Sequence, residues 1–188
     1  ILVCLVGSEM CIRDRSFPIY FTIIAIGVGL TAGTNTLIGN NLGANNKKKA
    51  SLFIAQSIIF AIFLSVLVTF FGLNVSDFLL SLMGSDPDGI TLSREYLDII
   101  FYGTIIVLIQ ISLNGTLNAQ GDTKSYRNVL IFTFFLNIFL NPLFIFGYGF
   151  VPAFGIAGLA IATVVAQFTG LLYLAHKVYC CELKQYLN

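Results

Sequence analysis

Residues 47–74 read KKKASLFIAQSIIFAIFLSVLVTFFGLN, three lysines followed by a long run without a charged side chain. A helix needs about 20 consecutive apolar residues to cross the ~30 Å hydrocarbon core of a bilayer, and residues 50–73 meet that length. Charged side chains are costly inside that core, so the lysines are expected in water at its edge. The stretch therefore predicts a membrane-spanning helix with a basic end.

Comparable apolar runs on both sides predict four more spans, at about 18–38, 96–117, 129–148 and 156–178. A shorter amphipathic stretch, Val75 to Met83, is expected to lie at the membrane interface. These spans predict an all-α integral membrane protein surrounded by lipid.

The composition supports this fold class. The 188 residues are 57% hydrophobic and only 10% charged, whereas a soluble domain carries roughly a quarter charged residues. The net charge of +1 provides no field for capturing polyanions, which argues against nucleic acid as a partner. The high share of hydrophobic residues and the low share of charged ones also exclude an ordinary soluble enzyme.

Residues 1–15, ILVCLVGSEMCIRDR, differ from the rest of the chain. Their apolar part is too short for a span, and they lack the features of a signal peptide. The stretch GSEMCIRDR resembles a translated sequencing adapter, and the alternative is a genuine short tail. We therefore expect a non-native segment over 1–15 and a helical membrane lobe over 16–188.

Basic residues are concentrated in alternate loops, which predicts the orientation. They follow the first, third and fifth predicted spans, most densely at 47–49. The positive-inside rule places these loops, and the C-terminal end, in the cytoplasm. The first span then starts outside, which suggests that an earlier span has been lost.

Amide side chains recur inside two of the spans. Gln110 and Asn114 are four residues apart on one helical face, and so are Asn137 and Asn141. Pro142 lacks an N–H and is expected to bend the helix and to free the carbonyl of Ile138. Such groups either line a solute or cation path or form an amide ladder that stabilises helix packing. The residues alone leave both interpretations open.

The end of the first span is rich in glycine and polar residues. Gly33, Gly39 and Gly43 are spaced to permit close backbone approach, and Thr36 and Asn40 lie between them. The segment predicts either a tight helix pair or, at Thr36 or Asn40, a cavity wall. No nucleophile triad, HExxH motif or pair of membrane aspartates is present in the sequence, so we expect neither an enzyme nor a metal site or cofactor.

Three segments in this order resemble the multidrug and toxic compound extrusion family of antiporters. They are GTNTLIGNNLGANNKKKA at 33–50, LNAQGDTKSYRN at 117–128 and NIFLNPLFIFGYGFVPAFGIAGLAIATVVAQ at 137–167. The family fold has twelve helices in two six-helix lobes. The resemblance implies that this chain is a fragment holding the second to sixth helices of the amino-terminal lobe, with the second lobe of the same chain missing.

The resemblance also implies a function: export of drugs or metabolites, often cationic, across the cell membrane in exchange for Na+ or H+, by alternating access. It implies a set of cavity residues: Asn137, Asn141, Gln110, Asn114, Thr36, Asn40 and, as an aromatic wall, Tyr102. It assigns packing, turn or bending roles to a second set: Gly33, Gly39, Gly43, Gly121, Asp122 and Pro142.

The sequence departs from the family pattern at Asn141, where an aspartate is common. This substitution puts proton coupling through this lobe in doubt. Two alternatives remain open. A lipid-linked oligosaccharide flippase of the same superfamily should carry basic residues inside its spans, and none of the five predicted spans has an interior Lys or Arg. The other alternative is a non-transporting membrane subunit or remnant.

Overall fold

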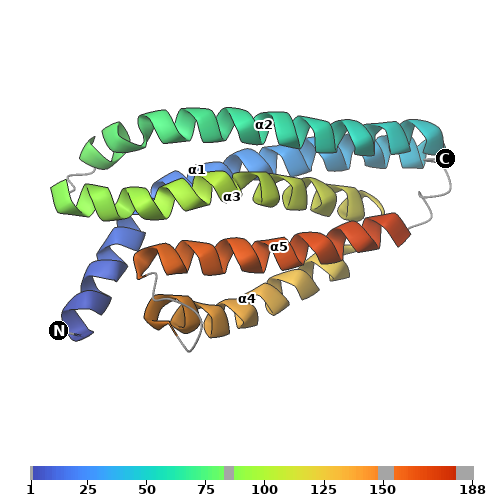
Figure 1. Cartoon of the computed structure of the whole chain (residues 1–188). Helices are drawn as coiled ribbons and strands as arrows, with labels where there is room; N and C mark the ends of the chain where they lie inside the picture. Colours follow the sequence, from blue (N-terminus) through green and yellow to red (C-terminus); the bar gives the residue numbers. More distant parts are fainter. Residues whose placement is uncertain (1, 83–86, 148–154, 181–188) are drawn as a thin grey trace.

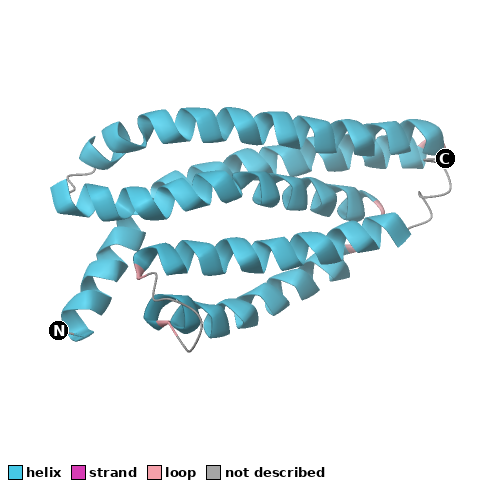
Figure 2. Ribbon diagram, viewed as in Figure 1, coloured by secondary structure: helices cyan, strands magenta, loops and turns pink. Residues whose placement is uncertain are grey.

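The computed structural model contains five helices (Figure 1), and it describes residues 2–82, 87–147 and 155–180. The helices are α1 (Leu2–Gly43), α2 (Lys47–Leu82), α3 (Pro87–Ala119), α4 (Thr123–Phe146) and α5 (Ile156–Cys180). Apart from the turns, the described residues are helical throughout (Figure 2). The predicted all-α membrane fold is confirmed.

Each helix contains a segment long and apolar enough to cross a membrane. The segments are Pro18–Gly43, Lys47–Ser76, Ser93–Ala119, Thr123–Phe146 and Ala157–Cys180. They coincide with the five predicted spans to within a few residues at most ends. Together with the large apolar side chains that stay exposed, such as Phe60, Phe63 and Phe70, they show a multi-pass membrane protein whose outer surface suits lipid.

Helix α3 is the centre of the bundle. It packs against α1 and α2 and also against α5, while α4 lies outermost and packs mainly against α5 (Figure 1). In the most apolar window of α3, 56% of the residues are buried, against 11% in α4. Phe101 of α3 is fully enclosed, in a cluster with Ile19 and Ile23 of α1 and Ala160 of α5.

Glycines allow the helices to approach closely at specific points. A Cβ at Gly115 of α3 would lie 3.1 Å from the carbonyl oxygen of Thr31 in α1, and one at Gly103 would lie 2.6 Å from Val164 of α5. A Cβ at Gly158 of α5 would overlap the carbonyl oxygen of Phe144 in α4. Small residues at these points let backbones touch, as in other membrane bundles.

The glycines predicted to pack, Gly33, Gly39 and Gly43, are not among those that touch another helix within the described part of the chain, and their packing role stays a prediction. A Cβ at Gly33, Gly39 or Gly43 would meet nothing within 4 Å. They share α1 with the packing residues but point away from α3, because the contact with α3 runs through Thr31 and Thr34. The spacing in the sequence shows which glycines lie close together on α1, but it does not show which side of α1 is covered by a neighbouring helix.

Hydroxyl groups connect α3 to its neighbours. Thr31 of α1 donates to the carbonyl oxygen of Ile111 at 3.2 Å, and Thr69 of α2 donates to that of Phe101 at 2.8 Å. The hydroxyl of Ser112 donates to Ser57 of α2 at 3.1 Å. In an apolar surrounding such bonds each contribute roughly 1 kcal/mol and fix the helix register.

The α3–α4 turn holds two residues that were assigned a structural role. Gly121 has φ +84°, in the left-handed region that favours glycine. Asp122 caps α4, accepting hydrogen bonds from the Ser125 amide at 3.0 Å and the Ser125 hydroxyl at 2.6 Å. The hydroxyl bond, then the amide bond, lowers the pKa of the Asp122 carboxyl below its ordinary value of 3.8.

Two boundaries differ from the prediction. The first helix starts at Leu2 rather than near residue 18, and Pro18 lies inside it (Figure 1). The second helix continues without a break past Leu73 to Leu82, so the predicted interfacial stretch is part of α2 up to that residue; Met83 lies outside the described residues. Pro142 lies inside α4, which continues to Phe146.

The two ends of the bundle differ in charge. The α1–α2 turn, the α3–α4 turn and the end of α5 lie at the same end (Figure 1). Lys47, Lys48, Lys49, Lys124 and Lys177 belong to these segments. At the opposite end, Arg94 pairs with Asp98 at 3.8 Å. The predicted alternation of basic loops therefore gives one basic end to the molecule.

Candidate functional site

A group of polar side chains lies where α3, α4 and α5 meet. Gln110 of α3 is 3% exposed, and its side-chain nitrogen lies 3.1 Å from where a Cβ of Gly170 would stand in α5. The same position is 2.7 Å from Val129 and 3.4 Å from Thr133, both in α4. Because Gly170 has no side chain, Gln110 can extend between α4 and α5.

The polar group continues along α4. Asn137 is one turn beyond Thr133, and its side-chain nitrogen donates to the Thr133 carbonyl oxygen at 3.0 Å. Asn141 is one further turn along, and Asn114 is one turn from Gln110 in α3. Because α3 and α4 run in opposite directions (Figure 1), Gln110 lies nearest Thr133, and Asn137 and Asn141 follow one and two turns further along α4, which packs mainly against α5 rather than α3. We call Gln110, Asn114, Asn137 and Asn141 the amide column.

Three amide oxygens of this column have no partner. The Oε1 atom of Gln110 and the Oδ1 atoms of Asn114 and Asn141 are buried and accept no hydrogen bond within the described part of the chain. A buried acceptor without a partner costs roughly 1–3 kcal/mol. Such groups in folded proteins are usually satisfied by ordered water, a ligand or another part of the protein, and among the described residues unpartnered atoms also occur outside the column, at Ser93, Asp98 and Gln120.

The amides have no charge and do not titrate. The column can therefore accept hydrogen bonds from a solute or offer oxygen ligands to a hard cation. Pro142 adds a further acceptor, because it supplies no N–H to the carbonyl of Ile138. The column cannot itself carry a proton.

The other predicted cavity residues lie elsewhere. Thr36 and Asn40 are exposed on a side of α1 that faces away from α3, and the Thr36 hydroxyl donates to its own helix at Ala32. Tyr102 is 67% exposed. The structure does not bring these three side chains to the four amides.

Sequence reasoning missed Thr133 and Gly170. Thr133 was detectable, because it precedes Asn137 by the same four residues that separate Asn137 from Asn141. Gly170 has no other glycine at helical spacing on either side, and nothing in the sequence indicates its contact with Gln110. Only the packing of α5 on α3 reveals it.

Comparison with known proteins identifies relatives of the chain. A family model described as MatE matches residues 15–143. The chain is 31% identical to the probable multidrug resistance protein YoeA of Bacillus subtilis over 84% of its own length and 34% of the relative. It is 28% identical to an FAD transporter of Shewanella oneidensis, covering 83% of this chain and 34% of that protein.

Solved structures share the fold. An inward-facing multidrug resistance MATE family transporter of the MOP superfamily superimposes with a TM-score of 0.86 and 28% identity. The match covers 93% of this chain and 39% of that one. The chain thus spans a little over a third of the length of the proteins it matches.

Proposed function

Because the chain belongs to the MatE family of membrane transporters, we propose that it forms part of an exporter of small organic molecules and that the amide column lines the solute path. The unpartnered oxygens of Gln110, Asn114 and Asn141 carry this proposal. A purely structural amide ladder would pair its own donors and acceptors. This column leaves three acceptors free for another molecule.

The chemistry of the column suggests the class of solute. Neutral amide oxygens accept hydrogen bonds from amines, amides and hydroxyls without demanding a fixed charge. Such a wall suits drugs or metabolites of varied structure, often cationic. The relatives are likewise named for solutes of different structure: one is named for multidrug resistance and another for FAD transport.

We propose Na+ rather than H+ as the ion coupled through this part of the protein. Oxygen ligands suit hard cations, and Asn141 and the Ile138 carbonyl freed by Pro142 offer them within one turn of α4. Proton coupling needs a titratable group, which the amide column lacks. Coupling to H+ would have to use carboxylates outside it.

Alternating access would move this helical lobe against a second lobe around a midplane site. The basic end, with the end of α5, would then face the cytoplasm of the cell membrane. In this arrangement the protein works by binding and conformational change rather than as an enzyme.

Replacing Asn137 by leucine tests the solute path. The change removes the amide that bonds to Thr133 and puts an apolar side chain in the column. We expect export of ethidium to fall at least about tenfold, since losing a site's polar contact and adding bulk costs 1.4 kcal/mol or more. Ethidium efflux is measured in cells that express the complete gene and lack other major pumps.

The matched control is Phe139→Leu, on the exposed side of the same helix. Export should persist in that variant at unchanged membrane expression. Wild-type export in Asn137→Leu would instead return the column to a structural role.

Replacing Asn141 by aspartate tests the coupling ion. The variant adds a titratable carboxyl group on α4 within one turn of the Asn137 amide and the Ile138 carbonyl, which are both neutral. Export should therefore become more pH-dependent than in the wild type. Transport in vesicles is measured under separate Na+ and pH gradients. An unchanged pH profile would show that this position does not meet the coupling ion.

A further inference from the structure

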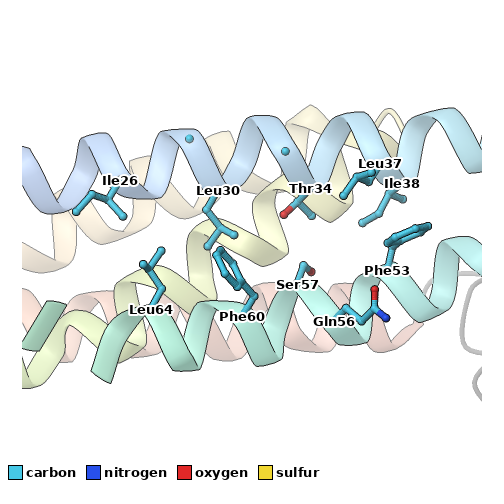
Figure 3. Close-up of a pocket in the computed structure, with 12 residues that line it drawn as sticks. Ile26, Leu30, Thr34, Leu37, Ile38, Phe53, Gln56, Ser57, Phe60 and Leu64 are labelled. Carbon is cyan, nitrogen blue, oxygen red and sulfur yellow. The ribbon is translucent and has the colours of Figure 1, made fainter. Parts of the chain in front are cut away.

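A groove lies between α1 and α2, outside the amide column. Figure 3 shows side chains from both helices pointing into it, among them Leu30 from α1 and Phe53 and Phe60 from α2. The groove has a volume of about 380 Å³ and is lined almost entirely by apolar groups. We call it the α1–α2 groove.

Two glycines form one wall of this groove. A Cβ at Gly29 or Gly33 would meet nothing within 4 Å, whereas one at Gly27, on the neighbouring side of α1, would lie 2.6 Å from Ile111 of α3. Larger side chains at Gly29 and Gly33 would fill the groove without disturbing the bundle. The groove is therefore open because of these two residues.

The length of the groove matches one leaflet of a membrane. From Ile26 to Ile38 the helix rises about 18 Å at 1.5 Å per residue. The hydrocarbon of one leaflet is about 15 Å thick, half of the ~30 Å core. On α2 the groove begins at Phe53, about one helical turn after Lys49. With the lysines at the membrane edge, the groove would lie in the leaflet nearest them.

The basic end supplies the complementary charge. Lys48 and Lys49 are exposed at the start of α2, and the turn from Ala44 to Lys48 forms a shallow, more polar depression beside them. Juxtamembrane lysines attract anionic lipid headgroups. Positive charge therefore stands where the headgroup of a lipid in the groove would lie.

We propose that the α1–α2 groove binds an anionic phospholipid, with one acyl chain along Gly29 and Gly33 and the phosphate against Lys48 and Lys49. The exposed Lys48 and Lys49 beside the end of the groove favour an occupant with an anionic headgroup over an uncharged protein segment. A single hydrocarbon chain is narrow enough to lie along the groove. This site is separate from the proposed transport and is tested without it.

These 188 residues contain no tryptophan, so a direct test uses the complete protein with any tryptophan outside them replaced by phenylalanine. Phe60→Trp places a single fluorophore in the groove, and Phe132→Trp places one on the exposed side of α4. The protein is reconstituted in lipid nanodiscs with dibrominated phosphatidylglycerol or dibrominated phosphatidylcholine, both of which quench tryptophan on contact. We expect phosphatidylglycerol to be preferred about tenfold at Phe60→Trp, and not at Phe132→Trp.

Second substitutions separate the headgroup from the chain. Lys48→Gln and Lys49→Gln should each reduce the preference about fivefold. Gly33→Leu should reduce quenching by both lipids at Phe60→Trp. Gly39→Leu, at another open glycine of α1, should leave the quenching unchanged.

Two results would overturn the proposal. Equal quenching by both lipids at Phe60→Trp would show ordinary lipid contact without an anionic site. Weak quenching by either lipid at Phe60→Trp, with strong quenching at Phe132→Trp, would show that protein covers the groove.

Discussion

Glycines occur in two contrasting surroundings in the bundle, at the contact between α4 and α5 and on the outer side of α1. Where α4 and α5 pack, Gly158 lies against the backbone of α4, so it can carry no side chain. On the outer side of α1, Gly33 faces open space. A glycine in a membrane helix thus marks either a tight contact or an opening, and the neighbouring helix decides which.

Gly158→Ala should have the largest effect on stability. Its Cβ would overlap the carbonyl oxygen of Phe144, and backbone cannot move aside as a side chain can. We expect a loss of about 1–3 kcal/mol, the usual cost of overpacking. Thermal unfolding in detergent measures it, and an unchanged melting temperature would show that α4 and α5 are not in close contact.

Gly170→Ala should have an intermediate effect on stability but a clear one on the proposed function. The new methyl group would lie 2.7 Å from Val129 and 3.1 Å from the Gln110 amide, both of them side chains that can shift. We expect about 1 kcal/mol of destabilisation and a several-fold loss of ethidium export, because Gln110 is displaced. Full export in a correctly folded variant would separate Gln110 from the solute path.

Gly33→Ala should have the smallest effect, and in the opposite direction. Nothing obstructs the new methyl group, and alanine is favoured over glycine in a helix by up to ~1 kcal/mol. The melting temperature should stay constant or rise. A loss similar to that of Gly158→Ala would mean that another helix packs on this side of α1.

Much of the fold could be predicted from the sequence. Five apolar runs of membrane length determine five helices, because hydrocarbon leaves the backbone no other way to pair its polar groups. Less could be predicted about packing. The polar spacing at 110, 114, 137 and 141 makes these four residues candidates from the sequence, but whether Gly33 or Gly158 touches a neighbour depends on helix rotation, which no local pattern encodes.

Helix rotation also explains why some residues predicted to line the cavity lie apart from the amide column. Thr36 is only two positions from the buried Thr34, so it lies on nearly the opposite side of α1. The family resemblance placed Thr36, Asn40 and Tyr102 in a cavity, and in this chain they are not adjacent to the four amides. Their role in transport stays a prediction.

The central claim is that the amide column meets an aqueous solute path, and thiol labelling at two neighbouring positions tests it most directly. With the native cysteines replaced by serine, Asn141→Cys and Phe139→Cys are treated with a membrane-impermeant thiol reagent. Asn141 has a buried acceptor without a partner, whereas Phe139 is 72% exposed on the apolar outer side of α4. The account predicts that Asn141→Cys is labelled, that ethidium slows this labelling, and that Phe139→Cys stays unlabelled. No labelling of Asn141→Cys, or equal labelling at both positions, would contradict it.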